Sequence, residues 1–398
     1  MQKYTPIPFE INLRPEGFIF DVGSLFEALL ALHDQRDARG VRYALVTVLV
    51  FVVLAKFAGE DWLRGIAQWV AERKEGLADF FGLAKPQAPC YTTYARILGR
   101  GVAIDEFEQI IHDFFAALPG AGHTVEIALD GKTLRGTIPL GASRGVHLLA
   151  AYFPGEGLVF MQVEVDSREN EIVAAPRVLK GLDLRGKIIT GDAMLTQRKL
   201  SVQIVEAGGE YVFPVKENQP QLLEDIQTLF APEKCVKGFS PATKDLRSAE
   251  KTEKGHGRIE QRTLTVSSEL KGYVDWPFAE QVFKLEREFE QMNTGKRTHE
   301  VVYGITSLSA KEAGAERLLK IVRGHWGIES GLHYRRDVTM REDRSRVQMG
   351  HAPHTLAVIN NLVLGLFARL GYTSAPEARR HFAAHLDEAV NLVLQARH

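Results

Sequence analysis

Three carboxylates, Asp130, Asp192 and Glu329, have the residue types and surroundings from which a catalytic site could be built. Asp130 and Asp192 each end a stretch with strand character, and each precedes a small residue, Gly131 or Ala193. Acids seldom stand at the end of a buried strand without partners. If these strands are neighbours and the Glu329 segment packs across their ends, the three carboxylates share one pocket. Divalent cations would relieve their repulsion, and two magnesium ions suit phosphodiester chemistry.

Glu329 lies in the segment Lys320–Arg346, which has seven Lys/Arg against four Asp/Glu, whereas the whole chain has a formal net charge of -1. On an α-helix, one mostly polar face of this segment would carry Val322, His325, Glu329, Leu332 and Arg336. The alternative is a solvated surface helix whose charges pair at i,i+4. The apolar lead-in AERLLKIV and the His325-Trp326 pair argue against full solvation.

Single motifs in this chain also fit structural roles or different chemistry. Each aspartate, taken alone, could cap a helix or close a turn. The GKT at 131–133 resembles the end of a phosphate-binding loop, but position 126 is Glu126 where that motif needs glycine, so a nucleotide triphosphatase is not expected. His351 and His354 have no Cys or HExxH partner nearby, which favours a capping or surface role over a zinc site.

The composition is that of a globular protein of two or three domains, with 398 residues, 45% of them hydrophobic and 25% charged. Cys90 and Cys235 have no metal-binding spacing, so we expect reduced thiols in a cytosolic protein, and the N-terminus lacks a signal-peptide pattern. The apolar run 44–59 is shorter than the roughly 20 residues of a membrane span and contains Lys56, which predicts a buried core helix. Since the net charge is near zero, nucleic-acid binding would have to come from local patches.

Residues 1–120 are expected to form a helical N-terminal domain, with four or five packed helices between Ser24 and Leu118. The segment CYTTYARILGRG (90–101) could be a short helix-turn-helix for binding DNA ends, although helices of this kind more often serve packing alone. This domain has 12 Lys/Arg and 15 Asp/Glu, so its charge alone does not make it a DNA clamp.

Residues 121–216 have the order three strands, helix, strand, helix, strand, which predicts a mixed α/β sheet of five strands. The first strand should end at Asp130, before a turn at Gly131, and the fourth should end at Asp192. Residues 217–310 begin with a helix and continue as a β-rich insertion. Residues 311–398 return to helical patterns and carry the third acid.

Several blocks resemble, in order, the H-repeat-associated transposases of bacterial insertion sequences, a branch of the DDE transposases. These blocks are ALDGKTLRG, SRENEI, ITGDAM, VKENQP, GHGRIEQR, HWGIESGLH and DVTMREDRSR, and they run from Ala128 to Arg346. The resemblance implies an RNase H-like catalytic core, a β-rich insertion and Asp130, Asp192 and Glu329 as the metal-binding triad. Two Mg²⁺ or Mn²⁺ ions are expected with it.

One departure concerns phosphate positioning. Related DDE transposases carry a Tyr, Arg, Glu, Lys signature on the last helix, and the corresponding positions are Val322, His325, Glu329 and Arg336. The glutamate is kept and the tyrosine is lost. Basic candidates for contacts with DNA phosphates are Lys132, Arg135, Lys216, Arg323, His325 and Arg336. Trp276 and Trp326 could stack on an unpaired base, although core packing accounts for them as well.

The resemblance implies a transposase that cleaves double-stranded DNA at element ends and joins the 3′ hydroxyls to target DNA. A homodimer is expected in the DNA complex, because two ends must be brought together. We also expect no membrane association and a cytoplasmic, nucleoid-associated location in a bacterium. Two alternatives remain open. One is an RNase H-like metal-dependent nuclease that does not join strands, and the other is a domesticated, non-catalytic DNA-binding regulator.

Overall fold

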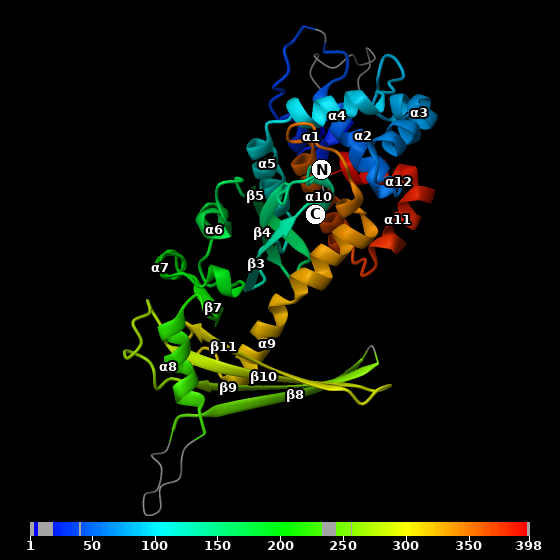
Figure 1. Ribbon diagram of the computed structural model, residues 1–398. Helices are drawn as coiled ribbons and strands as arrows, with labels where there is room; N and C mark the ends of the chain where they lie inside the picture. Colours follow the sequence, from blue (N-terminus) through cyan, green and yellow to red (C-terminus); the bar gives the residue numbers. More distant parts are fainter. Residues whose placement is uncertain (1–3, 7–18, 40, 233–243, 256, 396–398) are drawn as a thin grey trace, which may run out of the picture. The chain divides into compact units, whose positions relative to one another are not determined.

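The computed structural model describes residues 4–6, 19–39, 41–232, 244–255 and 257–395, so Cys235 lies outside the described residues. The chain forms two compact units, and each is built from segments that are far apart in the sequence. Unit 1 comprises residues 1–123, 131–168 and 329–398, and unit 2 comprises residues 124–130 and 169–328. Figure 1 labels many of the helices and strands of both units.

Unit 1 contains five helices between Ser24 and Leu118, where four or five are predicted. They are α1 (Leu25–Leu30), α2 (Leu45–Phe57), α3 (Leu63–Phe80), α4 (Tyr91–Arg100) and α5 (Ile104–Ala116). The N-terminal part is not purely helical, because β1 (Tyr4–Pro6) pairs antiparallel with β2 (Ile19–Asp21). Every residue of α2 is buried, which confirms the predicted core helix. Among the described residues, no helix is both long and apolar enough to cross a membrane.

The C-terminal helices of unit 1 are α10 (Ala352–Arg369), α11 (Ala375–Ala384) and α12 (Leu386–Leu394). Nearly all of α10 is buried because it is apolar around most of its circumference, and it packs against α4 and β5. Two of the predicted strands, β4 (His147–Phe153) and β5 (Leu158–Glu164), form an antiparallel hairpin.

Unit 2 is organised around a mixed sheet. Its parallel strands are β3 (Glu126–Thr133), β6 (Ile188–Thr190) and β7 (Glu210–Val215). The insertion adds antiparallel β11 (Arg297–Thr306), β10 (Gln281–Gln291), β9 (Arg258–Ser267) and β8 (Arg247–Gly255) beside β7. The helices are α6 (Glu171–Lys180), α7 (Arg198–Glu206), α8 (Pro220–Phe230) and α9 (Ala315–His325). The predicted mixed α/β class is confirmed, and the full strand order is β5-β4-β3-β6-β7-β11-β10-β9-β8.

Strand β3 belongs to both units, because its residues up to Asp130 lie in unit 2 and those from Gly131 lie in unit 1. The prediction of a turn at Gly131 is therefore wrong. The strand continues to Thr133, whose hydroxyl lies 2.8 Å from Nδ1 of His147 on β4.

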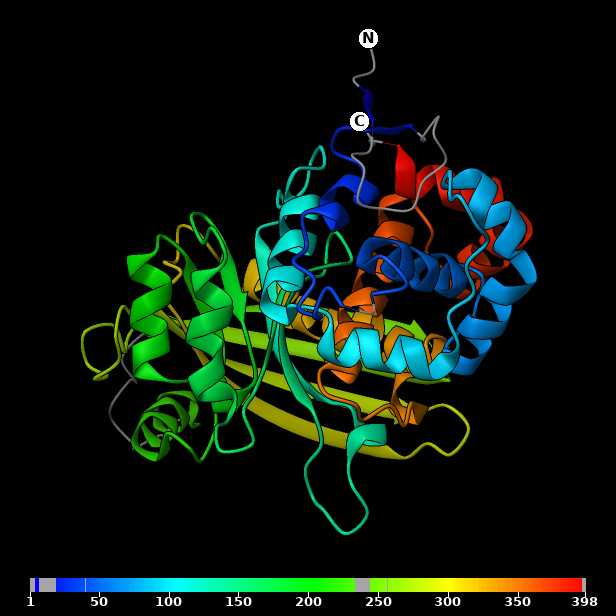
Figure 2. The same cartoon turned by 90° about the horizontal axis from the view of Figure 1, so that it is seen from above.

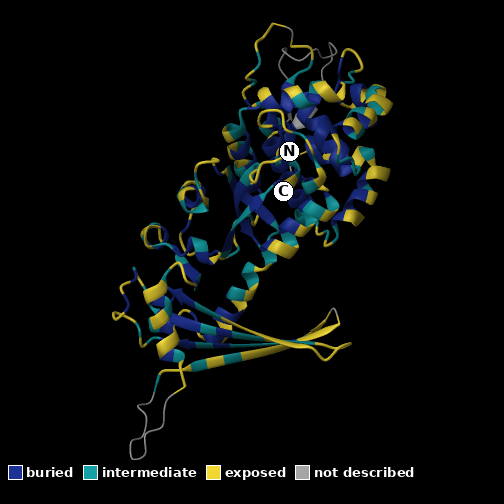
Figure 3. Ribbon diagram, viewed as in Figure 1, coloured by how far each residue is buried: buried dark blue, intermediate teal, exposed yellow. Residues whose placement is uncertain are grey.

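Strand β8 is not predicted by the sequence, since RSAEKTEKG has no apolar alternation. It forms one edge of the sheet, and most of its residues are exposed or half-buried (Figure 3). An edge strand buries little of its surface, so periodicity gives it no signal.

The segment around Glu329 is helical but is not one regular α-helix. After α9 come two π-helical stretches, Glu329–His333 and Arg335–Thr339. A π-helix forms i→i+5 hydrogen bonds, so it takes about one more residue per turn than an α-helix. The predicted common face of Glu329 and Arg336 is therefore wrong: the Glu329 side chain is 58% exposed, whereas Arg336 is fully buried.

Candidate active site

The first two acids lie at matching positions along neighbouring parallel strands, Asp130 within β3 and Asp192 just beyond β6. Ala128 of β3 is paired with Thr190 of β6, and Asp130 and Asp192 each come two residues later. Strand β6 ends at Thr190, so Asp192 lies just beyond the strand instead of ending it. Adjacent strands lie about 4.8 Å apart, and parallel strands end at the same edge of a sheet. The structure thus brings the segments that carry these two carboxylates together.

A 3₁₀ turn, Ala193–Leu195, fixes the backbone at Asp192. The Asp192 carboxylate accepts a hydrogen bond of 3.1 Å from the backbone N–H of Leu195 and caps this turn. The Asn218 amide donates to the carbonyl of Ala193 at 2.7 Å, and the Gln219 amide donates to that of Thr196 at 3.0 Å. Asn218 and Gln219 therefore hold the loop that presents Asp192.

The electrostatic surroundings of Asp192 disfavour its charge. Burial by the surrounding protein is the largest cause that raises the pKa of Asp192. The backbone N–H of Leu195 opposes this shift, while the negative charge of Glu171 adds to it. The positive charge of exposed Lys216 partly offsets this rise in the pKa of Asp192. A cation bound at Asp192 would favour the ionised carboxylate.

Glu329 opens the first π-helical stretch, with its carboxylate 3.7 Å from Nδ1 of His333. His333 is buried, and burial is the main cause that lowers its pKa to about 3, with further contributions from the positive charges of Arg336 and Lys132. At neutral pH, a neutral imidazole therefore lies beside Glu329. His333 is not among the residues predicted for the site, although its i+4 spacing from Glu329 was a usable signal.

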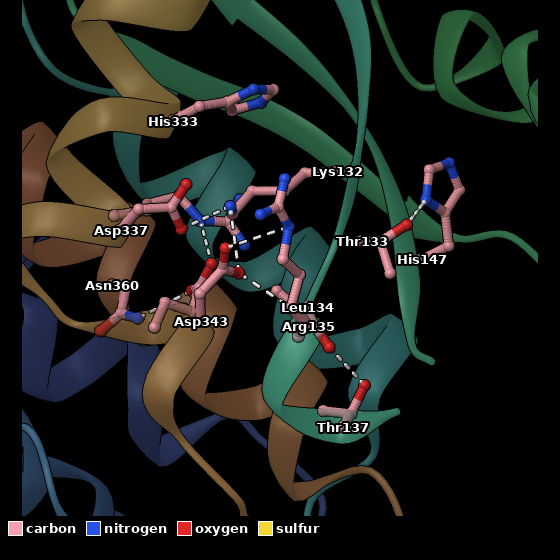
Figure 4. A network of polar contacts seen from close by, with 12 residues as sticks. Lys132, Thr133, Leu134, Arg135, Thr137, His147, His333, Asp337, Asp343 and Asn360 are labelled. Atoms are coloured by element: carbon pink, nitrogen blue, oxygen red, sulfur yellow. Dashed lines mark hydrogen bonds and ion pairs between the residues drawn. The ribbon is translucent and has the colours of Figure 1, made fainter. Parts of the chain in front are cut away.

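Lys132 is enclosed by carboxylates within unit 1. Its Nζ lies 2.5 Å from Oδ1 of Asp337 and 3.5 Å from Oδ1 of Asp343, and little of its side chain is exposed (Figure 4). Lys132 fastens the second π-helical stretch to β3, so the predicted contact between Lys132 and DNA phosphate is not available in this structure. Arg135 is 79% exposed, with its Nε 3.6 Å from Oδ2 of Asp343.

Arg336 does not face solvent either. Its Nε lies 2.8 Å from Oε2 of Glu342, and its Nη1 donates to Oε1 of Gln162 at 3.0 Å. Asn360 and Asn361 of α10 donate to Glu342 and Gln162. The predicted phosphate contact by Arg336 is therefore wrong, because this guanidinium is occupied in a buried polar network.

His325 and Arg323 lie at the end of α9 in unit 2. Nδ1 of His325 is 3.0 Å from the hydroxyl of Thr190, the last residue of β6. Burial lowers the pKa of His325 to about 4, so it is neutral at pH 7 and supplies no positive charge to a phosphate. The contact of His325 with Thr190 joins the end of α9 to β6. Arg323 is exposed and pairs with Glu253 at 2.5 Å.

The two candidate tryptophans differ in exposure. Trp276 is 7% exposed, which fits core packing and leaves no free face for a base. Trp326 is 54% exposed, and the guanidinium carbon of Arg287 lies 5.2 Å from its ring centroid. Arg287 is itself paired with Glu300 at 2.8 Å, so it is held in place beneath the indole.

Sequence comparisons identify the class. The family model described as "Transposase DDE domain" matches residues 122–366, and "DDE_Tnp_1-associated" matches residues 26–115. The chain therefore belongs to the DDE transposases, and its sheet is the RNase H-like core of that family with the insertion strands added beside β7. It is a transposase.

The relatives agree with this assignment. "Putative transposase YncI" of Escherichia coli O157:H7 is 31% identical over 351 residues, covering 87% of each chain. "H repeat-associated putative transposase YhhI" of Escherichia coli K12 is 26% identical over 350 residues, which is 87% of this chain and 90% of the relative. A solved synaptic complex of piggyBac transposase with hairpin DNA covers 92% of this chain and 76% of its own at 10% identity, with a TM-score of 0.39. A likeness that weak has no bearing on function.

Proposed function

We infer that this transposase cleaves DNA at the ends of its element and joins the resulting 3′ hydroxyls to target DNA, with Asp130, Asp192 and Glu329 as the catalytic acids. The observation that carries the proposal is the shared register of the first two acids, each two residues beyond the pair Ala128 and Thr190. Membership of the family supports the third acid. The RNase H-like nuclease and the non-catalytic regulator remain the alternatives.

The donor chemistry of these residues fits magnesium or manganese. Hard divalent cations prefer carboxylate oxygens, and the raised pKa of Asp192 beside Glu171 marks a place where bound positive charge stabilises the ionised form. Two bound ions would activate the attacking oxygen and stabilise the leaving oxygen of the phosphodiester. The protein's contribution is to hold one carboxylate within β3, one just beyond β6 and one on the first π-helical stretch.

Both reactions break one P–O bond and form another. In cleavage, water attacks the phosphorus and the 3′ oxygen leaves as a free hydroxyl. In joining, that hydroxyl attacks the phosphorus of a target phosphodiester. The bond to the target's own 3′ oxygen breaks, and this oxygen leaves as a hydroxyl. We propose that exposed Lys216 and Arg323 contact phosphates near this site and that Trp326 stacks on an unpaired base. Because two ends must meet, two copies of the chain are proposed to act together.

The test uses a labelled duplex that contains the DNA flanking the coding region, with Mg²⁺, Mn²⁺ or EDTA. We expect wild type to cleave and to join the cut strand to a plasmid, and Asp130→Asn, Asp192→Asn and Glu329→Gln each to lose both activities while still binding the duplex. Asp183→Asn is the matched control, since this acid is exposed and pairs with nearby Arg185. Double mutants should lose no more than single ones, because each acid serves the same site.

The outcomes separate the alternatives. Cleavage without joining would support the nuclease, and binding without either reaction in wild type would support the regulator. Near-normal cleavage by any of the three acid variants would show that the residue assignment is wrong. Activity that survives complete chelation would exclude the two-ion chemistry.

A further inference from the structure

A second surface in unit 1 combines outward-facing arginines with an exposed apolar tip. It is formed by the β3–β4 loop, residues 134–146, and by residues 341–346, which follow the second π-helical stretch. We call it the η1–η5 surface, after the 3₁₀ turns Arg135–Thr137 and Glu342–Arg344 that pack together in it.

The two segments are in backbone contact. A Cβ added to Gly136 would lie 2.0 Å from the carbonyl oxygen of Ser345, so only glycine allows this approach. The backbone N–H of Arg135 also donates to Oδ1 of Asp343 at 3.3 Å. The base of the loop and residues 341–346 are therefore held side by side.

The two acids of this surface, Glu342 and Asp343, are paired with cations of unit 1. Glu342 is buried, where it pairs with Arg336 and accepts a hydrogen bond from Asn360 at 2.8 Å. Asp343 is shared between Lys132 and Arg135. Their negative charge is thus largely compensated by cations of unit 1 itself.

The arginines of this surface are exposed to solvent. Arg344 and Arg346 are exposed, and in the described part of the chain neither guanidinium has a hydrogen bond or an ion pair. Arg135 is also largely exposed, and Arg144 in the same loop is exposed and donates to the carbonyl of Ser167 at 2.5 Å. The surface therefore carries a net positive charge, although the whole chain has a net charge of -1.

Leu140 stands at the tip of the loop with 107% exposure, after Pro139 and before Gly141, whose φ of 82° turns the chain. Figure 2 shows this loop, in teal, projecting beyond the ends of its strands. An exposed leucine by itself is common on protein surfaces. An exposed apolar tip on a loop that also carries Arg135 and Arg144, however, has the kinds of side chain that proteins use in the DNA minor groove.

We propose that the η1–η5 surface binds duplex DNA, with Arg344 and Arg346 on backbone phosphates and Leu140 in contact with bases or sugars in the minor groove. This inference rests on the proposed function, in that it takes DNA to be the substrate. The surface lies outside the three acids and the residues assigned to phosphate contacts near them, apart from Arg135. Its residues therefore differ from those proposed to act at the scissile phosphodiester.

The experiment measures the affinity for a 30-base-pair duplex in EDTA at several salt concentrations. Each phosphate contact contributes roughly 0.9 to the slope of log K against log salt. The variant Arg344→Ala/Arg346→Ala should reduce that slope by about two. Leu140→Ser should weaken binding about tenfold with an unchanged slope, because it removes apolar burial and no charge.

Matched controls have the same change of charge or polarity elsewhere. Arg185→Ala/Arg297→Ala removes two exposed arginines of unit 2, and Val173→Ser changes an exposed aliphatic residue. Both controls should keep the wild-type affinity and slope. Thermal unfolding of each variant checks that the fold is kept.

An unchanged slope in Arg344→Ala/Arg346→Ala, with wild type still cleaving, would overturn the surface and leave the proposed function standing. If the wild-type chain binds DNA through this surface but never cleaves it, the surface is supported and the proposed function is wrong. If Leu140→Ser bound the duplex with wild-type affinity, Leu140 would not contact the DNA. If the arginine variant lost only self-association, the surface would belong to a contact between two copies of the chain, and the proposal would be wrong.

Discussion

Arg336 and Glu342, six residues apart in the sequence, form an ion pair with Nε and Oε2 2.8 Å apart in the interior of unit 1. The pair joins the second π-helical stretch to β5 through Gln162 and to α10 through Asn360. It therefore ties together three segments that the sequence separates by as many as 198 positions, from Gln162 to Asn360.

Removing one partner of this pair should be strongly destabilising. Arg336→Met leaves the Glu342 carboxylate buried with Asn360 as its remaining partner, and loss of one member of a buried pair typically costs about 3–5 kcal/mol. Urea unfolding of Arg336→Met, Glu342→Gln and the double variant gives the coupling between the two side chains. The double variant should lose clearly less than the sum of the single losses. The exposed pair Arg185 and Asp183 is the control, and Arg185→Met should leave the midpoint unchanged. Additive losses in the first set would mean that the ion pair does not hold these segments.

The stability of unit 1 should fall as pH rises above neutrality, because of His354. Burial alone would lower the pKa of this imidazole, but hydrogen bonds and charge from Glu108 and Glu164 outweigh burial and raise it to about 9. A folded pKa above the unfolded value, about 6.5, gives stability that is complete below pH 6.5 and lost as pH rises through 9. The loss should be about 3 kcal/mol, measured by chemical unfolding from pH 6 to pH 10.

His354→Gln should flatten this pH dependence while lowering stability at pH 6. His381→Gln serves as the control, since its pairing with Glu388 at 2.9 Å lies at the surface. A wild-type profile that stays level between pH 6.5 and 9 would show that His354 is not held in its charged form.

Trp326 should matter for unpaired bases and not for intact duplex. Base stacking on an aromatic residue contributes about 1–3 kcal/mol, so Trp326→Ala should weaken binding of a frayed or single-stranded end roughly tenfold or more. Trp326→Phe should retain most of the affinity, and Arg287→Met should weaken it by loosening the indole. Trp62→Ala changes another exposed tryptophan and provides the comparison. Equal losses on duplex and single-stranded probes would assign Trp326 a structural role instead.

Cys90 should be reactive near neutral pH. Its sulfur lies 3.2 Å and 3.3 Å from the hydroxyls of Thr92 and Thr93, and these hydrogen bonds lower its pKa to about 7. Its rate of alkylation by iodoacetamide should therefore be half-maximal near pH 7. Peptide mass spectrometry resolves this residue from Cys235. Thr92→Val/Thr93→Val should move the midpoint toward the ordinary thiol value, about 8.5. An unmoved midpoint would mean that the hydroxyls do not stabilise the thiolate.

The elements that the sequence predicts best are those whose apolar residues repeat regularly. The runs at 146–153 and 158–165 predict β4 and β5, and the apolar run at 44–59 predicts α2. The π-helical stretches could not be predicted because the same polar residues fit an α-helix, and only tertiary contacts decide how the turns widen. The roles of Lys132 and Arg336 could not be predicted for a related reason. Their partners Asp337 and Gln162 lie 205 and 174 residues away, and no local pattern indicates such a pairing.

The family blocks point to three acids, and the structure adds the register that relates two of them. The flanking residues predict strand ends at Asp130 and Asp192, whereas β3 continues past Asp130 and β6 ends before Asp192. The parallel pairing of β3 with β6 supports the proximity of the two segments. Conversely, the basic residues near the acids suggest DNA contacts that the fold does not allow, because charge alone does not indicate burial. Lys132 and Arg336 are enclosed in unit 1, and His325 is neutral within unit 2.

The exposed edge strand β8 has a consequence for how the protein behaves at high concentration. A long, open strand offers its free backbone groups to any second sheet, and this is a common route to fibres and precipitates. Along β8 the sequence EKTEK places charged side chains at Glu250, Lys251, Glu253 and Lys254, so an approaching strand would have to desolvate them. The insertion can therefore extend the sheet far from its centre while the molecules stay dispersed.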